Sequence, residues 1–164
     1  MASDLDAAFP AVVEQMGTRL YWGLRRISGD HQEAEDLTQE TFIRAYNALE
    51  TYNATRIREM KLESWLWTIA LNLGRNHLRD RSRRPTWVEL EDRGTEDPEI
   101  ADGRSWDRRL GCLNQHQRTA VVLRHVMGMG IPDITEATGR PAGTVKADIH
   151  RGLAKLREVM EDET

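Results

Sequence analysis

The sequence is short of cysteine and proline and has no long apolar run, and each shortage excludes a class of protein. One cysteine, Cys112, rules out an internal disulfide and a thiolate-rich zinc site, and we expect it to be a small core residue. With 5 prolines and 12 glycines among 164 residues, the chain is neither collagen-like nor of low complexity. No apolar run approaches the ~20 residues of a membrane-spanning helix, and the N-terminus lacks a signal-peptide pattern. The sequence therefore predicts a cytoplasmic protein with no membrane insertion.

Charge is the next feature, because its average hides its distribution. The formal net charge of −4 argues by itself against a nucleic-acid partner. Counted by segment, however, residues 1–50 and 85–105 each carry −5, whereas residues 51–84 carry +5 and residues 106–164 carry +1. Such runs are often solvated helix faces, but two basic stretches separated by an acidic segment also favour contacts with nucleic acid. The two stretches are Arg75, Arg79, Arg81, Arg83 and Arg84, and Arg140, Lys146, Arg151, Lys155 and Arg157.

Apolar residues recur at helical spacing through most of the chain, and no strand pattern is present, so the fold class is predicted to be all-α. Pro10 is expected in the first turn of the first helix and Gly29 at its end, and Asp30 is expected to cap the second helix. A third helix is predicted from about residue 62, after a polar stretch at residues 51–60. From Ser82 to about Asp102 the helical periodicity disappears, Pro85 and Pro98 interrupt the segment, and acidic residues dominate it.

This loss of periodicity predicts two small helical domains joined by an acidic flexible linker. The domains are expected at residues 1–84 and 106–164, with the linker at residues 85–105. In the second domain we expect helices near 106–113, 115–127 with Asn114 as cap, 132–138 and from Pro141 onward.

The last two of these helices have the form of a helix-turn-helix, with Gly139 in the turn. Small residues at the start of the second helix allow it to approach base edges in the major groove. Lys146 and His150 are candidates for base-edge contacts, and Ala147 faces outward beside them. The candidates for phosphate contacts are Arg140, Thr144, Arg151 and Lys155.

Three segments in this order resemble bacterial extracytoplasmic-function (ECF) sigma factors of RNA polymerase. They are the residues Asp36-Leu37-Thr38-Gln39-Glu40-Thr41-Phe42, the residues Trp65-Leu66-Trp67-Thr68-Ile69-Ala70-Leu71-Asn72, and Gly143-Thr144-Val145-Lys146 followed by His150-Arg151-Gly152-Leu153. The resemblance covers nearly the whole chain. It implies a sigma domain two at residues 1–84 and a sigma domain four at residues 106–164.

The resemblance also implies a function for each segment. Asp36, Gln39, Glu40 and Arg44 match the helix that docks on the clamp of the β′ subunit of core RNA polymerase, and such proteins also contact the β subunit. The segment Asn53–Lys61 and the following helix match the reader of the −10 promoter element, which promotes DNA opening. Its candidate residues are Asn53, Trp67, Asn72, Arg75, Asn76 and Arg79. We expect Trp65 to be a core residue, and Trp67 either to stack on a base or to pack in the core.

The resemblance implies promoter DNA, core RNA polymerase and a separate anti-sigma factor as partners. The acidic linker would either enter the polymerase cleft or act as a simple tether. We expect no enzymatic activity, no cofactor and no metal. His31 with Glu35, or His116 with His125, would be a metal pair only if a further ligand were present, and no spacing provides one.

The alternative is a helix-turn-helix regulator that binds operator DNA without being a polymerase subunit. It leaves the segments at residues 36–42 and 65–72 without a role, and a sigma factor should bind duplex DNA only weakly on its own.

Overall fold

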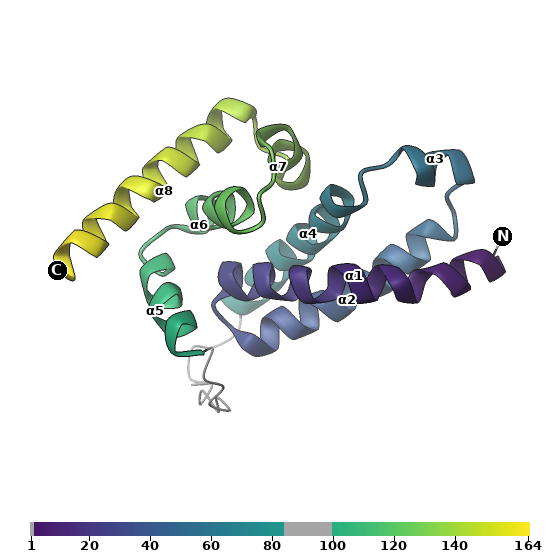
Figure 1. Ribbon diagram of the computed structural model, residues 1–164, viewed down its shortest axis with the longest axis horizontal. Helices are drawn as coiled ribbons and strands as arrows, with labels where there is room; N and C mark the ends of the chain where they lie inside the picture. The colour runs from purple at the N-terminus through teal and green to yellow at the C-terminus, as the bar shows by residue number, and fades with distance from the viewer. Residues whose placement is uncertain (1, 84–99) are drawn as a thin grey trace.

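The computed structural model describes the backbone of residues 2–83 and 100–164 and the side chains of residues 4–76 and 105–164. All regular structure in these parts of the chain is helical, as predicted (Figure 1). The predicted linker lies outside the described residues as far as residue 99. The helices are α1 (Ala2–Ser28), α2 (His31–Leu49), α3 (Ala54–Glu59), α4 (Leu62–Arg83), α5 (Ile100–Leu110), α6 (Gln115–Val121), the π-helical turn η1 (Val122–Val126), α7 (Ile131–Thr138) and α8 (Ala142–Asp162).

The first domain is built from α1, α2 and α4, and its local signals act as the sequence predicts. Gly29 ends α1 with a φ of 72°, a backbone conformation that glycine adopts without strain. The side chain of Asp30 caps α2 by accepting a hydrogen bond from the amide of Glu33 at 3.0 Å. The apolar stripe of α2 is buried against α1 and α4, from Ala34 to Leu49.

The start of α1 differs from the prediction, because Pro10 lies inside the helix and not in its first turn. Tertiary contacts explain the two additional turns. The ring of Phe9 packs edge-on against Phe42 and Tyr46, with centroids 6.2 and 5.3 Å away. The hydroxyl of Tyr46 donates a hydrogen bond to the Asp6 carboxylate, which raises the pKa of Tyr46 to about 12. These contacts with α2 hold the helix together where proline removes a backbone donor.

The second domain contains α5 to α8. Asn114 and Gln117 form a reciprocal capping box at the start of α6, and Gly139 ends α7 with a φ of 69°. Pro141 precedes the first turn of α8, in which Val145, Ile149 and Leu156 are buried. The apolar stripe expected on this helix also included Leu153, which is partly buried, and Met160, which is 42% exposed, so the stripe is not buried over its whole length. The arrangement of α7, the turn and α8 is the predicted helix-turn-helix, seen at the upper left of Figure 1.

Three local features depart from the sequence analysis. The polar stretch after residue 51 contains the short helix α3, which Asn53 caps through a hydrogen bond to its side chain from the amide of Arg56. The helix expected near 106–113 begins earlier, at Ile100, and ends at Leu110. Cys112 is exposed and is not a core residue, because it lies in the turn that follows α5.

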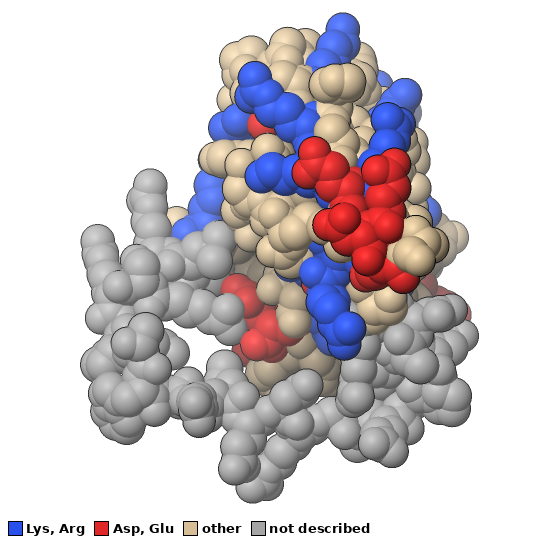
Figure 2. All heavy atoms as spheres, turned by 90° about the vertical axis from the view of Figure 1, so that its left-hand side faces the viewer, with Lys and Arg blue, Asp and Glu red and all other residues tan. Residues whose placement is uncertain are grey.

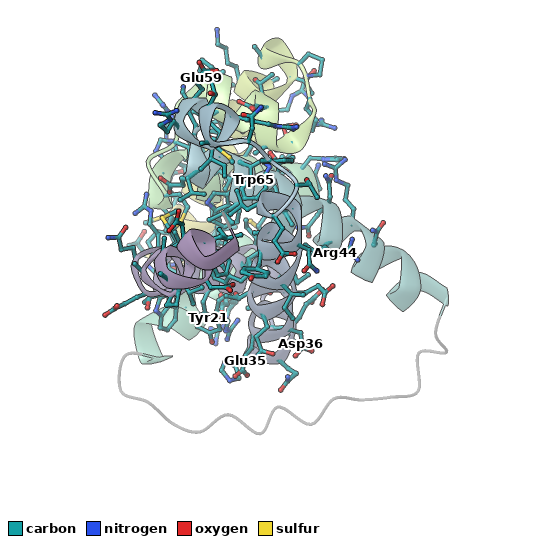
Figure 3. The ribbon with its side chains drawn as sticks, turned by 90° about the vertical axis from the view of Figure 1, so that its right-hand side faces the viewer. Tyr21, Glu35, Asp36, Arg44, Glu59 and Trp65 are labelled. Carbon is teal, nitrogen blue, oxygen red and sulfur yellow. The ribbon has the colours of Figure 1, made fainter. Side chains whose placement is uncertain are left out.

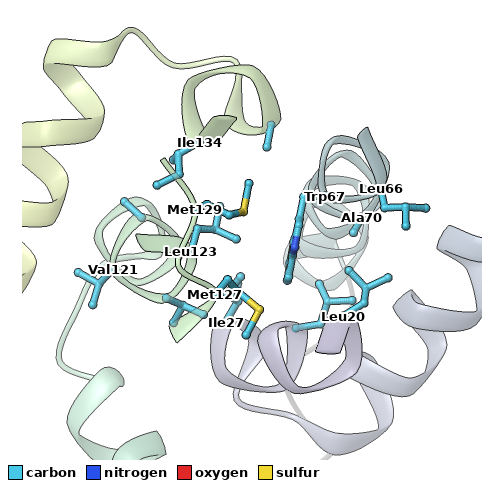
Figure 4. Packing of buried hydrophobic residues seen from close by; sticks show 14 of the residues in the cluster. Leu20, Ile27, Leu66, Trp67, Ala70, Val121, Leu123, Met127, Met129 and Ile134 are labelled. Atoms are coloured by element: carbon cyan, nitrogen blue, oxygen red, sulfur yellow. The ribbon is translucent and has the colours of Figure 1, made fainter. Parts of the chain in front are cut away.

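The helices of the two domains share one apolar core, and Figure 4 shows its centre. Trp67 on α4 points between Leu20 of α1 and the segment of the second domain that carries Met127 and Met129. Because α1 also packs on η1 and α4 packs on α7, the two domains lie directly against each other.

Gly152 provides a test of the packing within the second domain. A Cβ atom at this position would lie 2.7 Å from Cγ2 of Val121, so α8 can approach α6 only where residue 152 has no side chain. We expect Gly152→Ala to lower the free energy of unfolding by about 1–3 kcal/mol, measured by urea denaturation. Gly143→Ala is the matched control in the same helix, since a Cβ there meets nothing within 4 Å. It should be neutral or stabilise by up to about 1 kcal/mol; equal destabilisation by both variants would contradict the packing argument.

Candidate functional site

The predicted polymerase-docking residues lie together on the outer face of α2. Asp36, Gln39 and Arg44 are exposed and Glu40 is half-buried. The guanidinium Nε of Arg44 donates a hydrogen bond to Glu40 at 3.1 Å, and the amide of Gln32 donates one to Asp36 at 3.0 Å. Figure 3 shows Asp36 and Arg44 projecting from the same side of the helix. This acidic, polar face is unsuited to DNA and complementary to a basic protein surface.

Ile43 belongs to the same face, and the sequence analysis missed it. Its side chain is 56% exposed, although isoleucine is usually buried. Ile43 follows Gln39 by four residues and Glu40 by three, which places it on the face that carries them. The sequence could have indicated this residue, because helical periodicity places Ile43 on the outward, polar face of α2, where an aliphatic side chain is unusual.

The predicted −10 residues lie on α4 and beside α3. Asn72, Arg75 and Asn76 are exposed on α4, whereas the side chain of Arg79 lies outside the described ones. Asn53 is exposed and caps α3, as described above. The guanidinium of Arg56 lies over the ring of Tyr52, 3.6 Å from its centroid, so this region has a basic and aromatic surface.

Trp67 does not form part of that surface. Its side chain is only 1% exposed, so of the two expected alternatives the structure supports packing in the core and contradicts stacking on a base. On α4, Trp67 lies on a different side of the helix from Leu66 and Ala70, which belong to the apolar face. Trp67 is buried because the second domain covers it, and the periodicity of one helix cannot predict a contact with another domain. Trp65, the expected core residue, is partly buried and packs against the core.

The predicted −35 residues lie along the first half of α8. Lys146, His150, Arg151 and Lys155 are exposed, and Thr144 and Ala147 are half-buried. The other end of the helix carries acids, and Figure 2, which faces this side of the molecule, shows acidic side chains gathered beside lysines and arginines. The basic half therefore follows the turn of the helix-turn-helix, where a recognition helix meets DNA.

Arg140 has a partner within its own domain. Its guanidinium lies 3.0 Å from the carboxylate of Asp148, which is buried, so Arg140 stabilises the turn between α7 and α8. A phosphate contact from Arg140 would have to share the guanidinium with this ion pair.

Polar contacts also join the two domains. The Lys61 ammonium lies 3.1 Å from Asp133 of α7, and Arg75 donates a hydrogen bond to the carbonyl of Thr138 at 3.1 Å. Arg118 of α6 donates a hydrogen bond to the carbonyl of Arg26 at 2.6 Å. Burial lowers the pKa of Arg118, and the nearby Asp107 carboxylate opposes that shift.

Beside these contacts lies a cavity of about 260 Å³ between the domains. The −10 candidate Arg75 and the −35 candidate Arg140 both line it. The structure therefore brings together two residues that the sequence analysis assigned to separate promoter elements.

The histidine pairs have no metal-binding arrangement. His31 lies 3.7 Å from Glu35 and also contacts the hydroxyl of Tyr21. Among the side chains that the structure describes, no group of three histidine, cysteine, aspartate or glutamate residues is placed to hold a metal ion.

Comparisons with known proteins identify the class to which these two helical modules belong. Residues 12–84 match the family model of sigma-70 region 2, and residues 104–156 match that of sigma-70 region 4. The ECF RNA polymerase sigma factor SigW of Bacillus subtilis (strain 168) is 30% identical over 173 residues, covering 94% of this chain and 90% of its own. The chain thus belongs to the ECF sigma factors of RNA polymerase, a family of transcription initiation factors, as its motifs predicted.

Solved structures confirm the fold. CnrH, in complex with the cytosolic domain of CnrY, superposes with a TM-score of 0.75 at 24% identity, covering 99% of this chain and 94% of its own. The sigma factor RpoE from Bartonella quintana, in complex with the anti-sigma factor NepR, gives a TM-score of 0.73 at 23% identity over 93% of this chain and 96% of its own.

None of the helices described in residues 2–83 and 100–164 is long and apolar enough to cross a membrane.

Proposed function

We propose that this sigma factor docks on the β′ clamp of core RNA polymerase through α2, reads the −10 element with α4 and the segment before it, and reads the −35 element with α8. The observation that carries the proposal is the exposure of the candidate residues on three separate surfaces. Apart from Trp67, each candidate whose side chain is described is exposed or half-buried. Family membership alone does not assign individual residues to these contacts.

At the polymerase surface, the carboxylates of Asp36 and Glu40 would pair with basic groups of the clamp. Ile43, beside Gln39 and Glu40 on the same face, would supply an apolar contact within this patch. Interfaces of this kind gain most of their affinity from a few central, desolvated residues, while charges around them set orientation and specificity.

At the −10 element, the sigma factor would hold an unpaired base of the opened strand. Flipping one base out of the duplex costs about a few kcal/mol, so contacts to the single strand must offset that cost. The amides of Asn72 and Asn76 can pair with base edges, and Arg75 can neutralise a phosphate. DNA opening is thereby coupled to sequence recognition.

At the −35 element, α8 would enter the major groove. We expect Lys146→Ala and His150→Ala each to reduce transcription from a promoter with the cognate −35 sequence by about 5- to 150-fold, because each lost base contact is worth ~1–3 kcal/mol. Run-off transcription at cognate and base-substituted promoters measures the effect, with Arg157→Ala as control because Arg157 is exposed farther along α8. Equal losses at all promoters would exclude base recognition by Lys146 and His150.

The experiment that tests the whole proposal is transcription by core polymerase reconstituted with this protein on a genomic DNA library, followed by mapping of start sites. The proposal requires a defined set of starts that share −35 and −10 sequences and disappear without the protein. A regulator that is not a polymerase subunit would bind operator DNA alone and confer no start sites.

The remaining parts of the proposal follow from this function. The protein would act in the cytoplasm, where the polymerase is, and would catalyse no reaction and need no cofactor. A separate anti-sigma factor would regulate the protein, as a comparable arrangement is present in the structure of RpoE of Bartonella quintana with the anti-sigma factor NepR. Co-purification of the tagged protein from its host tests this partner.

A further inference from the structure

The first half of α8 carries one acid where every other charge is basic. Asp148 is the only acidic residue between Arg140 and Arg157. It is also buried, with 7% exposure, whereas the basic residues around it on α8 are exposed. Because a helix turns by about 100° per residue, Asp148 lies nearly opposite Lys146 and His150, two residues away on either side. A carboxylate is therefore buried directly behind the face that is proposed to read bases.

The partner of this carboxylate comes from the turn of the helix-turn-helix. The guanidinium of Arg140 donates a hydrogen bond to Oδ2 of Asp148 at 3.0 Å. The Nε atom of Arg140 is buried and has no hydrogen-bond partner among the described side chains, so Asp148 is the group that holds the guanidinium in place. The backbone amide of Arg140 donates to Oγ1 of Thr138 at 3.3 Å, and that hydroxyl donates to the carbonyl of Ile134 at 2.7 Å. One series of polar contacts thus joins α7, the turn and α8.

This ion pair constrains α8 in a way that its apolar stripe does not. Apolar side chains such as Val145 and Ile149 can repack when a helix rocks or rotates slightly, and cores of this kind lose uniqueness before they lose stability. A buried ion pair is less tolerant, because a charge that loses its partner away from water is strongly unfavourable. The pair of Arg140 and Asp148 therefore fixes the rotation of α8 relative to the turn.

We propose that Arg140 and Asp148 are positioning residues for −35 recognition. Their ion pair sets the angle at which α8 presents Lys146 and His150 to the bases, and Arg140 itself does not contact phosphate. A phosphate would compete for the guanidinium and leave the carboxylate of Asp148 buried without a partner, so the pair is retained in the complex with DNA. The inference rests on the proposed −35 role of α8.

The test treats the pair as a unit and measures promoter preference, which is the ratio of run-off transcription from a cognate −35 promoter to that from a base-substituted one. Arg140→Ala with Asp148→Ala leaves no unpaired charge buried, so its unfolding midpoint in urea should stay close to that of the parent. Its promoter preference should nevertheless fall at least about fivefold, the effect of one lost base contact. Arg140→Asp with Asp148→Arg reverses the ion pair and should recover most of the preference.

The matched control removes another ion pair of the same domain. The side chains of Arg109 and Glu163 lie 2.8 Å apart, and Arg109→Ala with Glu163→Ala also leaves the net charge unchanged. This variant should keep the promoter preference of the parent. Full preference in the double alanine variant at positions 140 and 148, or an equal loss in the control, would overturn the positioning role.

A phosphate contact by Arg140 would give different results with the same proteins. Loss of Arg140 would then weaken binding to all sequences equally and reduce the slope of log affinity against log salt by about one. The reversed pair would place a carboxylate against phosphate and would transcribe less than the double alanine variant. Asp148→Asn, which keeps the shape of the side chain, would release the guanidinium and strengthen transcription from both promoters, whereas positioning predicts a loss of preference. Any of these three results would overturn the proposal.

Coupling to Lys146 separates failure of this inference from failure of the proposed function. Lys146→Ala should reduce promoter preference in the parent but change it by less than about twofold in the double alanine background, because residues that act together are not additive. Equal effects in the two backgrounds would show that the ion pair does not position Lys146. No effect of Lys146→Ala in the parent would instead contradict the −35 role of α8, and the positioning role with it.

Discussion

Replacing both Asp36 and Glu40 by lysine is expected to remove binding to core RNA polymerase. The two carboxylates lie on the outer face of α2, and lysines there would repel the basic surface that they are proposed to meet. Loss of one partner of a desolvated charge pair typically costs about 2–5 kcal/mol. Reversal of two charges should therefore weaken binding at least about 100-fold, which corresponds to ~2.7 kcal/mol. Fluorescence titration of labelled protein with core polymerase measures this loss directly.

The control for this variant makes the same change of net charge elsewhere. Glu158 and Glu161 are exposed near the end of α8, and Glu158→Lys with Glu161→Lys should bind core polymerase as the parent protein does. Both double variants should keep the helical circular dichroism and unfolding midpoint of the parent, because the altered side chains are outside the core. Retention of polymerase binding by the α2 variant would exclude this face as the docking surface.

The salt dependence separates the charged from the apolar part of the same surface. Binding through Asp36 and Glu40 weakens as salt rises, because exposed charges are screened over ~8–10 Å at 0.1–0.15 M ionic strength. A contact through Ile43 depends much less on salt. The two contributions should be distinguishable within one titration series.

Most of the fold was predictable because its signals are local. Gly29 and Gly139 end helices through positive φ angles, and Asp30 and Asn114 cap the helices that follow them. Such features depend on the residue and its immediate neighbours, so they can be identified in the sequence. The start of α1 could not be predicted in this way, because contacts of Phe9 and Asp6 with α2 override the usual preference for Pro10 in a first turn.

The candidate site was predictable to a different extent on each surface. The exposed faces of α2 and α8 follow from helical period, since each buries one stripe and leaves the other outside. Trp67 does not follow this rule, because its burial depends on a domain more than 50 residues further along the chain. Cys112 shows the opposite error. It was predicted to be a core residue because cysteine is usually buried, but it lies in an exposed turn. Contacts between domains and the conformation of turns are the information that periodicity does not contain.

Asn72→Ala together with Asn76→Ala is expected to prevent promoter opening while leaving initial binding nearly unchanged. Both amides are exposed on α4, and in the proposed −10 role they would pair with base edges of the separated strand. Each lost base contact is worth ~1–3 kcal/mol, so the double variant should reduce the open fraction by at least about 30-fold. Permanganate reactivity of unpaired thymines measures opening, and gel-shift affinity of the holoenzyme for duplex promoter DNA measures initial binding.

The double variant should fold normally, because alanine has a higher helix propensity than asparagine and neither side chain belongs to the core. Gln15→Ala on α1 removes an exposed amide from the same domain at a position outside the −10 surface and should leave both measurements unchanged. A premelted template with a bubble across the −10 element provides the decisive comparison. Since the energy of opening is then already supplied, transcription by the double variant should recover only as far as its remaining strand contacts permit. Full recovery would mean that Asn72 and Asn76 assist strand separation without holding the separated strand, whereas equal loss on duplex and bubble templates would place their contribution entirely in strand binding.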